Sequence, residues 1–287
     1  MFALSKMKFR FIRRASFLLV VLTGAFAAAY AQQAVPIQAP FVRGEELVYQ
    51  AEFNRSLLRG INVGELRFTA KPASNGVGGN GGNGKSSLLL VGDASAKGFL
   101  LRLFGSQFHL HVESVLNAES LAVLSTKKVE EQKKRTRVSD AIFDHTSRKV
   151  TWTERNQGQT EPPDVTTVDF TEPVQDVLTV IYYVRTQRLE PGQTFEVPLT
   201  DVSRVYRCSV NVIERKKIKT IFGQVNAVRV EPAIFGDNRV VRSRGTLSIW
   251  FTDDARRIPV KAQIKVPLGT FDITLKRATY PDASRVG

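Results

Sequence analysis

The chain has 287 residues, with 41 Lys or Arg against 27 Asp or Glu, so its net charge is +14 at pH 7. Cys208 is the only cysteine, which excludes an intramolecular disulfide and leaves stability to an ordinary hydrophobic core. No apolar run reaches the roughly 18 to 20 residues that a membrane-spanning helix needs, so we expect no transmembrane segment in the mature chain.

The N-terminus has the pattern of a secretory signal peptide. Five basic residues precede an apolar run over residues 15–29, and Ala29 and Ala31 form a small-x-small cleavage site. We expect cleavage after Ala31, with a retained N-terminal anchor as the alternative. Removing the five basic residues of segment 1–31 leaves 36 basic against 27 acidic residues, a net charge of +9. Such a surface in an envelope favours anionic lipid, glycan or phosphate as partners over nucleic acid.

The mature chain should begin with a short disordered lead over residues 32–40, followed by one β-rich domain over residues 41–281. Residues 47–53 and 61–68 alternate in polarity and predict a first hairpin, whose loop closes on Gly60. The segment 74–84 consists almost entirely of Gly and Asn and predicts a flexible exposed loop.

A phosphate-loop pattern, G-x-x-x-x-G-K-S, occurs over residues 79–86. We interpret it as a chance match, because it continues a low-complexity loop and precedes a predicted strand instead of a helix.

The middle of the chain predicts a meander of strands interrupted by one helix. Strand-like segments fall near residues 108–113, 121–130, 136–143, 148–154 and 164–170. Residues 174–187 carry helix start and stop signals, with apolar side chains around the whole circumference. We expect a buried helix that braces a large, curved, antiparallel sheet, either barrel-like or a sandwich, although its β-branched residues make a strand the competing interpretation. Further hairpins should follow from Phe195 to Tyr280.

Two patterns invite a catalytic or metal-binding interpretation. His109, His111 and Glu113 share one face of a strand, which can present two imidazoles to zinc, but the sequence offers no third partner. Asp253 and Asp254 could serve acid–base chemistry, yet adjacent Asp residues are typical of a hairpin turn. We therefore predict no catalytic residue, no bound metal and no cofactor. Cys208 should be a small buried side chain.

An anion-binding patch is the more plausible site for a basic envelope protein. Arg239, Arg242 and Arg244 lie at alternate or nearly alternate positions of a predicted strand. We add three aromatic candidates for ligand contacts: Tyr182, Tyr183 and Trp250.

Three parts of the chain together resemble the DUF3108 family of exported bacterial proteins: residues 44–49, residues 176–178 with 182–185, and residues 245–260 with Trp250. The last segment is the most specific, and the resemblance extends from about Phe41 to Tyr280, with the glycine-rich insertion as a departure. It implies a periplasmic or secreted β-rich protein of a bacterium, and it implies no reaction.

Two functions remain open. The first is a non-enzymatic envelope protein that binds an amphipathic or anionic component, lipid or glycan. The alternative is an enzyme acting on an envelope polysaccharide, in which carboxylates such as Asp176, Asp253 and Asp254, or the pair His109 and His111, meet in a cleft.

Overall fold

The computed structural model of the protein describes residues 41–73, 87–97, 108–133, 135–202 and 204–280. The chain divides into two units, residues 1–36 and 37–287, and all described residues belong to the second. The predicted signal peptide, disordered lead and glycine-rich loop with its phosphate-loop pattern lie outside the described residues.

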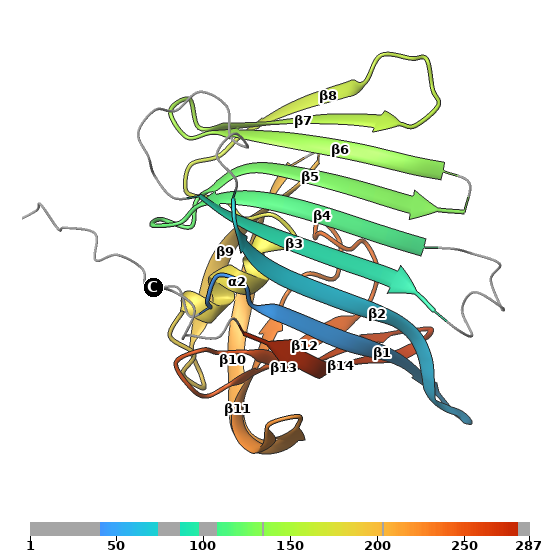
Figure 1. The fold of residues 1–287 in the computed structure, drawn as a ribbon, viewed down its shortest axis with the longest axis vertical. Helices are drawn as coiled ribbons and strands as arrows, with labels where there is room; N and C mark the ends of the chain where they lie inside the picture. Colours follow the sequence, from blue (N-terminus) through green and yellow to red (C-terminus); the bar gives the residue numbers. More distant parts are fainter. Residues whose placement is uncertain (1–40, 74–86, 98–107, 134, 203, 281–287) are drawn as a thin grey trace, which may run out of the picture. The chain divides into compact units, whose positions relative to one another are not determined.

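The described residues form fourteen strands of a single antiparallel sheet, in the order β8-β7-β6-β5-β4-β3-β2-β1-β14-β13-β12-β11-β10-β9 (Figure 1). The strands of its first half are β1 (Glu46–Arg55), β2 (Leu58–Pro72), β3 (Ser87–Ala96), β4 (Phe108–Asn117), β5 (Val123–Gln132), β6 (Arg135–Asp144), β7 (Lys149–Asn156) and β8 (Asp164–Asp169). Those of its second half are β9 (Thr194–Asp201), β10 (Arg204–Thr220), β11 (Gly223–Pro232), β12 (Thr246–Thr252), β13 (Pro259–Val266) and β14 (Gly269–Thr279).

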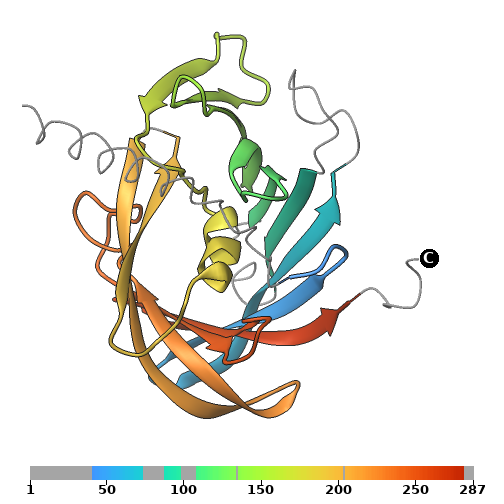
Figure 2. The same cartoon turned by 90° about the vertical axis from the view of Figure 1, so that its left-hand side faces the viewer.

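The sheet follows the polarity pattern of the sequence and curves around one helix, α2 (Thr179–Thr186) (Figure 2). Bulges interrupt several strand pairs, for example between Val48 and Tyr49, and such bulges bend a strand and increase its twist. The strands β8 and β9 at the two ends of the sheet do not pair with each other, so the sheet is not closed. The prediction of a curved, antiparallel, barrel-like sheet braced by one helix is confirmed.

The helix separates two parts of the hydrophobic core. Leu178 and Tyr182, at its start, pack against a cluster from β2, β3 and β4 that includes Leu90. Val184, on another side of the helix, packs against a cluster from β9 to β12 that includes Phe251. Apolar residues all around the helix therefore correspond to contacts with both halves of the sheet.

Three local features differ from the sequence expectations. The helix covers 179–186 and not 174–187, because residues before it form a bridge between Gln175 and Leu199 of β9. Gly60 lies within β2, since a two-residue turn at Ser56 and Leu57 closes the first hairpin earlier.

The segment containing Arg239, Arg242 and Arg244 connects β11 to β12 as a loop and forms no strand apart from one isolated bridge. Pro232, Gly236 and Gly245 interrupt the strand pattern, as Pro and Gly commonly do. Among the described residues, no helix is long and apolar enough to cross a membrane.

Candidate functional site

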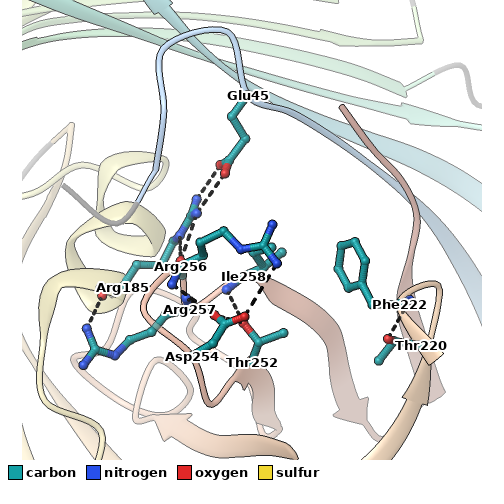
Figure 3. A network of polar contacts seen from close by, with 9 residues as sticks. All are labelled: Glu45, Arg185, Thr220, Phe222, Thr252, Asp254, Arg256, Arg257 and Ile258. Carbon is teal, nitrogen blue, oxygen red and sulfur yellow. Dashed lines mark hydrogen bonds and ion pairs between the residues drawn. The ribbon is translucent and has the colours of Figure 1, made fainter. Parts of the chain in front are cut away.

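The polar interior contains an ion pair between Glu45 and Arg185 (Figure 3). The chain enters β1 next to Glu45, and α2 places Arg185 opposite it, with an Nη1–Oε1 distance of 2.6 Å. Both side chains are only 1% exposed. Burial alone would lower the pKa of Arg185, but the hydrogen bond and charge of Glu45 outweigh that effect and raise it.

The β12–β13 turn is bound to the same end of the helix. Arg185 donates from Nε and Nη2 to the carbonyl oxygen of Arg256, at 3.2 and 3.1 Å, and Arg257 donates to the carbonyl oxygen of Arg185 at 3.0 Å (Figure 3). Asp254 accepts hydrogen bonds from Thr252 and from two turn amides, while Asp253 pairs with Arg215 at 2.9 Å. The two aspartates therefore stabilise a hairpin turn, in agreement with the sequence interpretation.

Asp176 holds the other end of the helix. Its carboxylate accepts hydrogen bonds from the hydroxyls of Ser114 on β4 and Thr126 on β5, at 2.6 and 2.5 Å. It also accepts the backbone N–H groups of Leu178 and Thr179, which are the unsatisfied donors of a helix start. Four donors satisfy this buried carboxylate, so it acts as a cap and tether, and it does not meet Asp253 or Asp254.

A second polar cluster lies on the outer face of the sheet, where three neighbouring strands bring His109, His111 and several carboxylates into register. Asp93 of β3 is paired with His111 of β4, and His109 with Glu131 of β5. The Nδ1 atom of His111 lies 2.7 Å from Asp93, and its Nε2 atom lies 3.4 Å from Glu113. His109 contacts Asp93 and Glu131 at 3.7 and 3.6 Å. The sequence correctly placed the histidines together on a solvent-facing side.

These contacts set the proton affinity of His111 and leave no shared metal position. Partial burial of His111 lowers its pKa. Its hydrogen bonds to Asp93 and Glu113 raise the pKa by more than burial lowers it, so the net shift is upward. One nitrogen of each histidine faces the same Asp93 oxygen, while the other nitrogen faces Glu131 in His109 and Glu113 in His111. Within the described part of the chain, no group of three or more His, Cys, Asp or Glu side chains is arranged to hold a metal ion.

A shallow hollow of about 290 Å³ adjoins the histidines. Its lining residues are Glu65, Arg67, Asp93, Ser95 and His109. Carboxylate, guanidinium, hydroxyl and imidazole groups in one open hollow can bind a polar ligand, and they include groups able to accept and donate protons.

The predicted aromatic ligand contacts do not share one site. Tyr182 is buried against Phe41, with a ring-centroid distance of 4.9 Å, while Tyr183 is only half-buried. Trp250 lies on the opposite side of β12 from Phe251, and Phe251 belongs to the cluster packed on α2. The ammonium groups of Lys216 and Lys261 lie 5.6 and 5.4 Å from the centre of its ring.

The three predicted arginines also have different environments. Arg239 is half-buried and donates to the carbonyl oxygen of Arg207 at 3.1 Å. Arg242 and Arg244 are exposed in the loop before β12. Only these two are available to a ligand as free cationic groups.

Arg242 and Arg244 lie near other basic residues that the sequence analysis did not select. The loop enters β12 beside Lys265, because Thr246 at the start of β12 pairs with Lys265. On the other side of β13, β14 pairs with β1, and β1 ends at Arg55. We call this group the basic rim: Arg55, Arg59, Arg242, Arg244 and Lys265. All five are exposed, and none makes an ion pair with another described residue. The acidic residues nearest along these elements are Glu52 on β1, Asp272 on β14 and Asp237 in the loop.

Strand register explains why sequence reasoning missed Asp93 and most of the basic rim. Asp93 meets the histidines only through the pairing of β3 with β4, which the sequence does not specify. For the rim, a local signal was present: Arg55 and Arg59 flank an apolar pair, Leu57 and Leu58, at a predicted hairpin loop, where polar residues are usual.

Comparison with known proteins adds a family and a fold. A family model described as "Protein of unknown function (DUF3108)" matches residues 48–276. No curated protein matches the chain. Among solved structures, a β-barrel-like protein of the DUF1849 domain from Brucella abortus is similar, with a TM-score of 0.53, 10% identity, and coverage of 84% of this chain and 100% of that one.

A protein with a YmcC-like fold from Bacteroides fragilis matches with a TM-score of 0.33 and 7% identity, over 84% of this chain and 98% of that chain. The similarity to the Brucella protein shows a shared fold alone.

Proposed function

We propose a function for this chain from the premise that it belongs to the DUF3108 family, in agreement with the resemblance seen in its sequence. It is an exported cell-envelope protein that binds an anionic envelope component at the basic rim, without catalysis. The anion chemistry is phosphate or carboxylate, as on lipid headgroups or acidic glycans.

The observation that carries this proposal is the absence of ion pairs at the rim, within the described residues. Some basic residues elsewhere on the sheet have acidic partners, such as Arg155 with Asp140 and Arg137 with Glu154. The basic residues of the rim have none, so their charge remains available to a partner. The predicted export signal and the net positive charge of the mature chain agree with an anionic partner in the envelope.

The interior supports surface binding over carriage of a ligand inside the sheet. The helix α2 and the clusters packed on both of its sides occupy the concave side of the sheet. A partner would therefore contact the outside of the protein, where the rim lies.

The proposal is tested by measuring binding to three anions: phosphatidylglycerol vesicles, polyphosphate and polygalacturonate. The comparison shows whether the anionic group belongs to a lipid headgroup, a free phosphate polymer or an acidic glycan. The wild-type protein and all variants are purified in the same way, from the envelope of the cells that express them. All of them therefore have the same N-terminus in the comparison. Replacing Arg55, Arg59, Arg242 and Arg244 with Gln should lower the affinity for vesicles on the order of a thousandfold, since each basic residue near an anionic surface contributes about 1 kcal/mol.

The matched control replaces two paired arginines, R137Q and R155Q, which should retain wild-type affinity. Wild-type affinity in the four-residue rim variant, or no binding of the wild-type protein to any of the three anions, would overturn the proposal.

The outer-face hollow supports a second candidate, an enzyme acting on an envelope polysaccharide. Its specific basis is that Glu65, Asp93 and His109 line one open hollow, so two carboxylates and an imidazole are available to the same ligand. Release of reducing sugar from envelope polysaccharides by the wild-type protein, and its loss in H109A and D93N, would support this candidate. Absence of release by the wild-type protein would end it.

A further inference from the structure

Three apolar residues lie at the hairpin tips next to the basic rim, and we call them the leucine tips: Leu57, Leu58 and Leu268. Leu57 occupies the two-residue turn between β1 and β2 and is 99% exposed. Leu268 occupies the turn between β13 and β14 and is 49% exposed, and Leu58 is 43% exposed. Scattered exposed leucines need no explanation, but leucines grouped at adjacent turns do.

Strand pairing places the two turns side by side. Asn54, the residue before the end of β1, pairs with Thr270 near the start of β14. Gly269 packs directly on β1, since a Cβ atom added there would lie 2.6 Å from Phe53 and 2.8 Å from the carbonyl oxygen of Asn54. The absence of a side chain at Gly269 lets the tips approach this closely.

The residues in the two turns of the leucine tips are not those that a hairpin turn requires for folding. Two-residue hairpin turns favour Gly, Asn and Asp. Two longer turns of this sheet carry Asp: residues 144–148 are Asp-His-Thr-Ser-Arg, and residues 253–256 are Asp-Asp-Ala-Arg. At the leucine tips, the turn residues are Ser-Leu and Pro-Leu. Places where local sequence preference is violated without a packing gain are commonly functional.

The basic rim surrounds these tips on the same elements. Arg55 pairs with Leu58 across the first turn, Arg59 follows Leu58, and Lys265 lies three residues before Leu268. Exposed leucines encircled by unpaired arginine and lysine match the interface of an anionic bilayer, where apolar side chains enter the acyl boundary and cations remain at the phosphates.

A third apolar turn, Ile221 with Phe222, is separate. It joins β10 to β11, and Ala227 of β11 pairs with Thr252 at the end of β12, whereas Lys265 pairs with Thr246 at its start. The ring of Phe222 also lies 5.9 Å from the guanidinium of Arg256, which belongs to the network of Figure 3.

We infer that the anionic partner is the surface of a lipid bilayer, and that Leu57, Leu58 and Leu268 insert into it while the basic rim contacts the headgroup phosphates. This inference rests on the proposed function and deepens it by naming the partner's class. An acidic glycan would use the rim charges but would offer nothing to three exposed leucines.

Vesicle co-sedimentation separates the two contributions. Protein exported and recovered from the envelope is mixed with vesicles of phosphatidylglycerol and phosphatidylcholine (1:1), and in parallel with soluble polyphosphate. The double variant L57S and L268S should lose at least about tenfold in vesicle affinity, because burying a leucine side chain contributes roughly a factor of ten or more. Its affinity for polyphosphate should not change.

The matched control is I142S, which removes an isoleucine that is 63% exposed on β6, away from the tips. Its vesicle affinity should equal that of the wild-type protein. An independent readout is the variant L57W with doxyl-labelled lipid, since Trp152 and Trp250 are buried and give little quenching of their own. Fluorescence of the introduced Trp should shift to the blue and be quenched.

The outcomes distinguish the inference from the function on which it rests. If L57S with L268S binds vesicles as the wild-type protein does, or Trp at position 57 is not quenched, insertion is wrong. The proposed function would then survive if the rim variant still loses binding. If the wild-type protein binds neither vesicles nor any soluble polyanion, both fail.

Discussion

The buried polar network around α2 and the basic rim use arginine in opposite ways. Arg185 is enclosed, bound bidentately to Glu45 and bonded to a backbone carbonyl, whereas Arg55, Arg59, Arg242 and Arg244 are exposed, and no described residue forms an ion pair with them. A buried charge must be paired in the folded state, because the loss of its hydration is otherwise uncompensated. An exposed charge has no such requirement. Pairing inside therefore identifies structural residues, while an exposed charge without an ion pair remains available to an outside partner.

Breaking the buried pair should give the largest effect on stability. Removing one partner, as in E45Q or R185M, leaves an uncompensated buried group and should lower the free energy of unfolding by about 3–5 kcal/mol. Equilibrium urea unfolding measures this loss. The double variant E45M with R185M should be more stable than either single variant, and a loss below about 1 kcal/mol in both single variants would contradict the structural role of the pair.

The Asp176 tether should come next. In D176N an amide replaces the carboxylate, and its single oxygen cannot accept all four hydrogen bonds. We therefore expect a loss of about 1–3 kcal/mol in the free energy of unfolding. The control is D254N in the exposed β12–β13 turn, where Asp254 also accepts hydrogen bonds from backbone N–H groups. This change should lower the free energy of unfolding by only about 0.5–1 kcal/mol. Equal losses at the two positions, measured by urea unfolding, would show that burial does not distinguish them.

The histidine cluster lies between these extremes and should give a smaller, pH-dependent effect. The folded-state pKa of His111 is raised, so protonated His111 is favoured by folding. Its contribution to stability is fully present below the unfolded pKa of about 6.5 and is lost as pH rises through the higher folded-state pKa. The difference in urea midpoint between the wild-type protein and H111Q should therefore decrease as the pH rises from 6 to 8.5. A difference that is constant over this range would contradict the role of the Asp93 and Glu113 contacts.

Much of the fold could be predicted because its signals are local. Alternating polarity identified most strands, and apolar residues around the whole helix indicated burial between two surfaces. The start of the helix was misplaced because Pro173 and the helix-like run after it do not reveal that Gln175 bridges to β9. That contact is between residues far apart in sequence, so no local pattern encodes it.

The candidate sites were less predictable because each depends on strand register. The pair His109 and His111 could be recognised from spacing two apart on one strand, but Asp93 joins them only through the β3–β4 pairing. Likewise Arg242 and Arg244 were selected for their spacing, while Arg55, Arg59 and Lys265 join them through the order β1-β14-β13-β12. The segment around Arg239 is a loop, so the alternate spacing that selected these arginines does not correspond to one face of a strand.

The smallest expected effect on stability belongs to the basic rim, and it is the most informative. Replacing Arg55, Arg59, Arg242 and Arg244 together with Gln removes four charges that have no described partner, so the free energy of unfolding should change by less than about 0.5 kcal/mol per site. The same variant should bind phosphatidylglycerol vesicles far more weakly, and added salt should weaken the wild-type protein in the same direction. A large loss of stability in this variant would mean that the rim holds the fold together, and the contrast with Arg185 would disappear. Retained stability with lost binding would show that these arginines serve a partner and not the fold.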